Sequence, residues 1–174
     1  MDSKVPRQLR VSAASLARRH RTPRRIAADA VVSGTAASLA SAAALMAASA
    51  SNEGSMAGGL NGPSQWLWGE NEAYTRRWTL RHTATGYVIH NATSIFWAAL
   101  HETMFGGKRR KSPIRRCAEA AVSAGTAYVV DYYLTPPRFR PGFEKHVSRR
   151  GMFAAYTAFA AGLAITAIAR DRRR

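Results

Sequence analysis

Four long stretches of this 174-residue chain contain no lysine or arginine, and this feature limits its fold more than any other. All 26 basic residues lie outside them, in the remaining 90 residues. The stretches cover residues 26–50, 83–105, 117–134 and 152–169. A water-soluble helical protein places Lys and Arg on the wet face of each helix, so such stretches are typical of membrane spans. The sequence therefore predicts an all-α, polytopic integral membrane protein, built as a four-helix transmembrane bundle.

The basic residues give the chain a net charge of +16, which on its own would suggest a nucleic-acid-binding protein. The arm of residues 1–25 and the tail of residues 170–174 are cationic but lack aromatic residues that could stack on bases. Each Lys or Arg close to anionic headgroups contributes about 1 kcal/mol of membrane binding. We therefore expect both segments, which flank a membrane domain of residues 26–169, to contact an anionic bilayer surface. Nucleic acid is not an expected partner.

The basic residues are also divided unequally between the two sides of the predicted membrane. With four alternating spans, the arm, the 106–116 loop and the tail bring 18 Lys and Arg to one side. The connectors 51–82 and 135–151 bring 8 to the other. The positive-inside bias makes the richer side cytoplasmic, which predicts a plasma-membrane protein with both termini in the cytoplasm.

Small residues recur at every fourth position in the first and last spans, where they would let neighbouring backbones approach closely. These rows are Ala30, Gly34, Ser38 and Ala42, and Ala154, Ala158, Gly162 and Thr166. We expect the first span to be an inner helix. The last span should pack through its small-residue row and turn bulky residues such as Phe159 to lipid. A homo-oligomer is a possible assembly.

The first span has a second interpretation as a secretory signal sequence, because it follows a basic segment and ends at Ala48, Ser49 and Ala50, which resemble a cleavage site. Its 25 residues are long for a signal core, and Asp29 is unusual in one. Cleavage would leave three spans and an outside N-terminus.

The 51–82 connector is predicted to begin as a flexible glycine-rich segment and to continue as a short interfacial or re-entrant helix over residues 63–77. Trp66, Trp68, Tyr74 and Trp78 support this position, because Trp and Tyr prefer the headgroup level. The helix would be an anchor or a lid on the outer surface.

Polar side chains inside the spans form the candidate site, because lipid contact would be unfavourable for them. They are Asp29, His90, Asn91, Ser94, His101, Glu102, Glu119 and Asp131. Counting from the span ends places Asp29, His101, Glu102 and Glu119 in a cytoplasmic layer. His90 and Asp131 fall in an outer layer, about 6 Å apart in depth, and are expected to form a pair. His90, Ser94, Trp97 and His101 lie on one stripe that must face protein.

These residues have two interpretations. In the first, they cap helix ends and link neighbouring helices by hydrogen bonds. In the second, they form a cluster that binds a cation or relays protons, with His as the group that titrates near neutral pH. No metal or cofactor is expected, since His101 and Glu102 are adjacent and the chain has no HExxH motif and no Cys pair.

Five short segments resemble a group of small uncharacterised proteobacterial inner-membrane proteins, over roughly residues 26–168. They are NGPSQWLWG (61–69), RHTATGYVIHN (81–91), SIFW (94–97) with Glu102, VDY (130–132) and PGFE (141–144). The resemblance implies four membrane helices in a bacterial inner membrane and no established activity. Members often carry His-His where this chain has His90 and Asn91.

Three function classes remain open. The first is a structural or regulatory protein of the envelope. The second is a small proton- or cation-linked carrier that uses the His and acidic residues. The third is a lipid-modifying enzyme, for which the sequence offers no nucleophile motif of the Gly-x-Ser-x-Gly kind.

Overall fold

The computed structural model describes residues 21–107 and 109–173, and this part of the chain is helical throughout, with no strand. The long helices are α2 (Pro23–Glu53), α5 (Thr85–Met104), α6 (Pro113–Val129) and α7 (Arg149–Arg172). A π-helical turn, η4 (Val130–Leu134), continues α6. Each predicted span therefore corresponds to a helix. Most of the predicted N-terminal arm lies outside the described residues.

Local signals in the sequence explain where the long helices begin and end. Ser112 and Ser148 cap α6 and α7, because each hydroxyl accepts a hydrogen bond from a backbone N–H in the first turn. Pro113 occupies the first turn of α6, where its missing N–H has no consequence. Gly54 ends α2 in the left-handed region, with a φ of 75°, which glycine adopts without strain.

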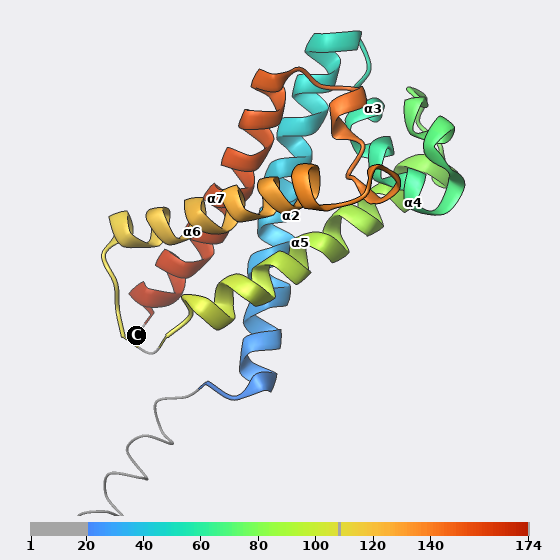
Figure 1. Ribbon diagram of the computed structural model, residues 1–174. Helices are drawn as coiled ribbons and strands as arrows, with labels where there is room; N and C mark the ends of the chain where they lie inside the picture. The colour runs from blue at the N-terminus through green and yellow to red at the C-terminus, as the bar shows by residue number, and fades with distance from the viewer. Residues whose placement is uncertain (1–20, 108, 174) are drawn as a thin grey trace, which may run out of the picture.

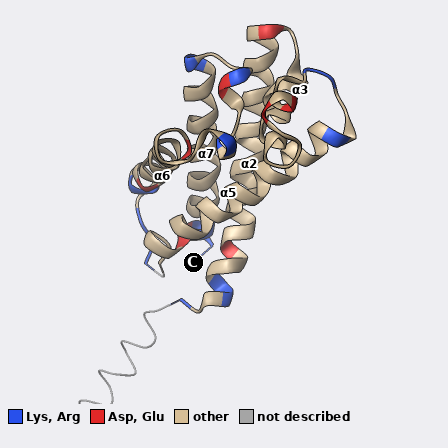
Figure 2. Ribbon diagram, turned by 45° about the vertical axis from the view of Figure 1, so that its right-hand side comes forward, with Lys and Arg blue, Asp and Glu red and all other residues tan. Residues whose placement is uncertain are grey.

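Helix α2 is the centre of the fold, since it packs against both α5 and α7. In Figures 1 and 2, the axes of α2 and α7 are similarly inclined and their chains run in opposite directions, whereas α5 and α6 cross this pair obliquely. Rows of residues four apart that interdigitate favour crossing angles of about 50° in magnitude. The helices therefore form a crossed arrangement instead of an array with parallel axes.

Two glycines mark the closest approaches of α2 to its neighbours. A Cβ at Gly34 would lie 2.6 Å from the Ile95 Cα, and a Cβ at Gly162 would lie 2.5 Å from the Ala37 Cα. All four small residues predicted on the inner face of α2 are buried: Ala30, Gly34, Ser38 and Ala42. The prediction of an inner first helix is confirmed.

The corresponding prediction for α7 is partly wrong. Gly162 is buried, but Ala154 is exposed and Ala158 is half-buried. Phe159, predicted to face lipid, is 6% exposed and belongs to the core with Leu163. The reason is geometric, because a strict four-residue row drifts by about 40° around the helix at each step. The row therefore lies on the packed face of α7 at Gly162 and outside it at Ala154.

The connector between α2 and α5 folds into short helical segments and not into one interfacial helix. They are α3 (Met56–Asn61), η1 (Gly62–Ser64), α4 (Gln65–Trp68), η2 (Glu70–Tyr74) and the π-helical η3 (Leu80–Ala84). The prediction of a flexible first part is wrong, because Gly58, Gly59 and Gly62 are buried. A Cβ at Gly59 would lie 2.6 Å from the Leu45 carbonyl oxygen, so glycine permits this close contact. The connector between α6 and α7 contains η5 (Pro137–Phe139) and η6 (Phe143–Lys145).

Two of the helices, α2 and α7, are long and apolar enough to cross a membrane. Charged residues gather toward the helix ends and in the connectors, as Figure 2 shows. The structure thus supports membrane association through two helices of an all-helical fold.

Candidate functional site

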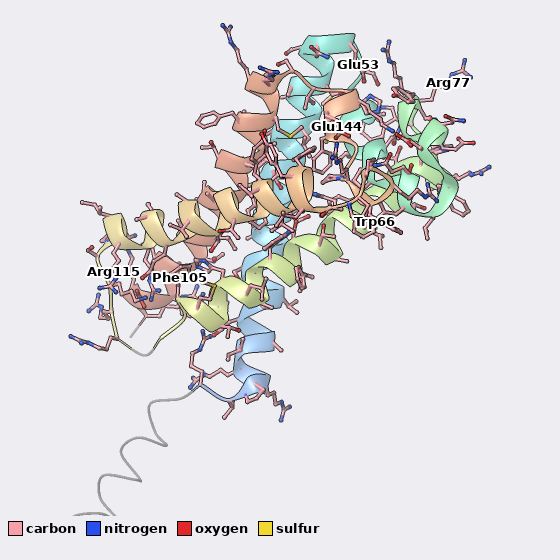
Figure 3. All side chains as sticks on the ribbon, viewed as in Figure 1. Glu53, Trp66, Arg77, Phe105, Arg115 and Glu144 are labelled. Atoms are coloured by element: carbon pink, nitrogen blue, oxygen red, sulfur yellow. The ribbon has the colours of Figure 1, made fainter. Side chains whose placement is uncertain are left out.

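A cavity of about 290 Å³ lies between α2, α5, η4, α7 and the two connectors. Most of its wall is apolar or aromatic, and Trp66, labelled in Figure 3, contributes from α4. Its polar lining residues are Ser41, His90, Thr93, Ser94, Asp131, Thr135 and Tyr156. Pockets that bind small molecules have this character, a mostly apolar wall with a few polar groups, and volumes from roughly 300 Å³ upward.

His90 reaches the cavity from α5 and is buried. Its Nε2 lies 3.0 Å from Ser41 Oγ and 3.3 Å from the Ser38 carbonyl oxygen. The Ser41 hydroxyl already donates to the Ala37 carbonyl at 2.8 Å, so His90 Nε2–H is the donor in both contacts. In the neutral ring, Nδ1 is then an acceptor, and no described residue bonds to it.

Asp131 reaches the same cavity from η4, at the end of α6. Its Oδ2 accepts a 2.7 Å hydrogen bond from the hydroxyl of Tyr156 on α7. No described residue forms an ion pair with this carboxylate. Aromatic rings surround the Tyr156 side chain, because the Tyr128 ring lies 5.3 Å away and the Tyr132 ring 6.4 Å away.

The structure brings His90 and Asp131 to one cavity but does not pair them. Each is bonded to a different neighbour, and they form no ion pair within the described chain. Helical rise predicts that two residues share a depth, but it does not determine the direction of their side chains. Ser94 and Trp97 line the cavity with His90, so the predicted stripe does face protein. Asn91 is not part of the lining.

The acids predicted for the cytoplasmic layer lie together at the opposite end of the helices. Glu102, only 2% exposed, accepts hydrogen bonds from Arg170 at 2.6 and 2.8 Å and from Arg21 at 2.8 Å. Asp29 contacts Arg21 and lies 2.9 Å from Arg170. Arg170 therefore links α2, α5 and α7.

Glu119 extends this network to α6. It pairs with Lys111 at 2.6 Å and with Arg116 at 3.3 Å, and Arg116 also pairs with Asp171 at 2.7 Å. Phe105 and Arg115, labelled in Figure 3, mark this end of the molecule. His101 lies in the same layer, where its Nδ1 is 2.8 Å from the Ser123 hydroxyl. The sequence analysis identified Asp29, Glu102 and Glu119 but neither Asp171 nor the basic partners of these acids.

A second polar network, which the sequence analysis missed, lies at the C-terminal end of α2. The His146 ring contacts Glu53 through Nδ1 at 2.6 Å and the Ala73 carbonyl through Nε2. Both ring nitrogens thus face oxygen atoms. Glu53 also pairs with Arg76 at 2.7 Å. No sequence signal pointed to His146, because it is a single histidine in a polar connector.

Within residues 21–107 and 109–173, no group of three or more His, Cys, Asp or Glu side chains could hold a metal ion. Comparisons with protein-family models, curated proteins and solved structures give no match to this chain. The cavity with His90 and Asp131 is therefore the candidate site on geometric grounds.

Proposed function

We propose that this chain is a structural or regulatory protein of a bacterial inner membrane that acts by binding a small, mostly apolar molecule in its cavity. The cavity is the observation that carries the proposal. Its wall combines aromatic side chains with a few polar groups on four separate elements, and this combination fits ligand binding better than simple helix packing.

The proposal includes four membrane spans with both termini in the cytoplasm. Two contacts show that α6 runs opposite to α7 in chain direction while it crosses α7 obliquely (Figure 1). Arg116 meets Asp171 near one end, and Asp131 meets Tyr156 near the other, 15 residues away on each helix. This separation corresponds to about 22 Å along a helix. Exposed apolar side chains on α5, such as Val88, Phe96 and Met104, would face lipid.

The proposal also retains the first span. Cleavage after Ala50 would remove the helix that packs on both α5 and α7. It would also remove Ser41 and Leu45 from the cavity wall and Asp29 from the ion-pair network. The position of α2 therefore favours a membrane anchor that stays in the protein.

A binding assay with a neutral probe tests the proposal. Protein in lipid nanodiscs is titrated with tritiated 1-naphthylmethanol, and empty nanodiscs provide the blank. We expect saturable binding, which Thr93→Phe should weaken by roughly tenfold or more because Thr93 lines the cavity. Ala92→Phe is the control, since Ala92 is the exposed neighbour on the same helix. Absence of saturable binding, or equal effects of both variants, would contradict the proposal.

A second candidate function is a proton- or cation-linked carrier, favoured by one observation: His90 and Asp131 face the same cavity. In this case the bound ligand would move together with an ion. Proteoliposomes with an internal pH dye provide the test, because ligand addition should change the internal pH for the native chain and not for Asp131→Asn.

A further inference from the structure

We infer that the cavity selects a lipophilic organic cation, an amine that is protonated and carries an apolar body, and that Asp131 is its counter-ion. This inference rests on the proposed binding function and specifies its ligand. It combines three observations on the cavity: a carboxylate without an ion pair to any described residue, aromatic walls, and a lining that contains no Lys or Arg from residues 21–107 and 109–173.

The charge of the lining is opposite to the charge of the chain. The protein has 26 Lys and Arg, and none lines the cavity among the described residues. Other carboxylates with little exposure, namely Glu53, Glu102, Glu119 and Asp171, each have an Arg, Lys or His at ion-pair distance. Asp131 has no ion-pair partner among the described residues, and its neighbours are two uncharged donors, the Tyr156 hydroxyl and the Trp97 side chain. A carboxylate in an apolar wall is stabilised by a nearby cation, which no described residue of the wall supplies and which a bound ligand would supply.

The remaining wall suits the apolar body and the positive charge of such a ligand. Trp97, Tyr156, Phe143 and Phe159 line the cavity around the two polar groups. The faces of aromatic rings attract cations within about 6 Å, most strongly when water is excluded. An anionic ligand would meet the same faces and the Asp131 carboxylate with unfavourable electrostatics.

His90 adds a second hydrogen-bond acceptor. Its Nε2–H is used by Ser41 and the Ser38 carbonyl, which leaves Nδ1 of the neutral ring as an acceptor. A protonated primary or secondary amine has two or more N–H donors, so it can satisfy Asp131 and still offer a hydrogen to a neighbouring acceptor. Carboxylate and phosphate groups offer no donor of this kind.

Three probes of one shape test the charge preference. Protein in nanodiscs of neutral lipid is titrated with tritiated 1-naphthylmethylammonium, 1-naphthylmethanol and 1-naphthoate, each against empty nanodiscs. We expect the ammonium to bind at least about tenfold more tightly than the alcohol and the naphthoate to bind most weakly. Equal affinities of ammonium and alcohol would overturn the inference but leave the proposed binding function intact. Absence of saturable binding by all three probes would overturn both.

Asp131→Asn identifies the counter-ion. We expect this variant to lose the preference for the ammonium while it still binds the alcohol, since the side chain keeps its size. Glu144→Gln is the control, because it removes a carboxylate that is exposed and outside this cavity. Alcohol binding also shows that the variant is folded. A preference that survives Asp131→Asn, or that Glu144→Gln removes equally, would contradict the role of Asp131.

Discussion

Glu102 and Asp131 are two carboxylates in the helical part of the fold, and their surroundings differ. Glu102 receives hydrogen bonds from Arg170 and Arg21, so its charge is neutralised within the protein. Asp131 faces a cavity and bonds to a tyrosine. Sequence position predicted the depth layer of each residue. It could not predict the partners, because Arg21 and Arg170 lie 81 and 68 residues from Glu102 in the chain.

At this scale we predict that Glu102→Gln destabilises the protein. The change removes the more deeply buried of the two carboxylates, Glu102 and Asp29, that join the Arg170 and Arg21 guanidinium groups. Breaking a buried ion pair in this way costs about 3–5 kcal/mol. The free energy of unfolding in mixed micelles, measured by titration with sodium dodecyl sulfate, should decrease by this order.

Glu70→Gln is the matched control, since the Glu70 side chain is 56% exposed and its ion pair with Lys145 is 3.5 Å long. Exposed pairs contribute about 0–1 kcal/mol, so this variant should unfold close to the native midpoint. Similar midpoints for both variants would show that the Glu102 network does not hold the helices together.

At the scale of elements, the small-residue rows had different outcomes in α2 and α7. The row in α2 is buried because neighbours cover this central helix on two sides, which tolerates the drift of the row. In α7 the packed face is narrow, and the row leaves it. The sequence therefore predicted the buried face of the inner helix well. It failed for Phe159, because nothing in the α7 sequence indicates which side carries the cavity.

We predict that bulk at Gly162 is resisted, whereas bulk at the adjacent Ala161 is tolerated. The Cβ of any residue at 162 would overlap the Ala37 backbone, so Gly162→Leu forces α2 and α7 apart. Overpacking of this kind costs about 1–3 kcal/mol, and occasionally more. Ala161 is exposed on the same helix. The monodisperse yield in detergent should decrease for Gly162→Leu alone, and equal yields for Gly162→Leu and Ala161→Leu would argue against a close α2–α7 contact.

At the scale of the whole molecule, the ion pairs bring the first and last described segments to one end. Arg21, just before α2, and Arg170, near the end of α7, both bond to Glu102. Their proximity agrees with an even number of membrane crossings between Arg21 and Arg170.

The positions of the long helices and the gathering of charges toward their ends were predictable from the sequence, because both follow from its hydrophobic composition. The cavity was not, because it depends on the crossing of helices and on connectors whose glycines are buried.

The central position of α2 implies that the first helix stays in the protein. We predict that the protein extracted from the membrane contains residues 1–50, because α2 forms the centre of the fold. A peptide that crosses Ala50 should be found after digestion of the extracted protein. A mature chain that starts at Ser51 would require a different packing of α5 and α7.

The orientation of the protein in the membrane can be measured by thiol labelling at Cys117, which is the single cysteine of the chain. Cys117 is exposed one position after Arg116, in the turn of α6 that joins the ion-pair network predicted to lie on the cytoplasmic side. A membrane-impermeant maleimide added to intact spheroplasts should therefore leave it unlabelled, and permeabilisation should expose it. Glu144→Cys combined with Cys117→Ser provides the opposite control, since Glu144 is exposed in the connector predicted to lie outside. We expect that cysteine to react without permeabilisation. Labelling of Cys117 from outside would reverse the orientation and place the cavity nearer the cytoplasmic side.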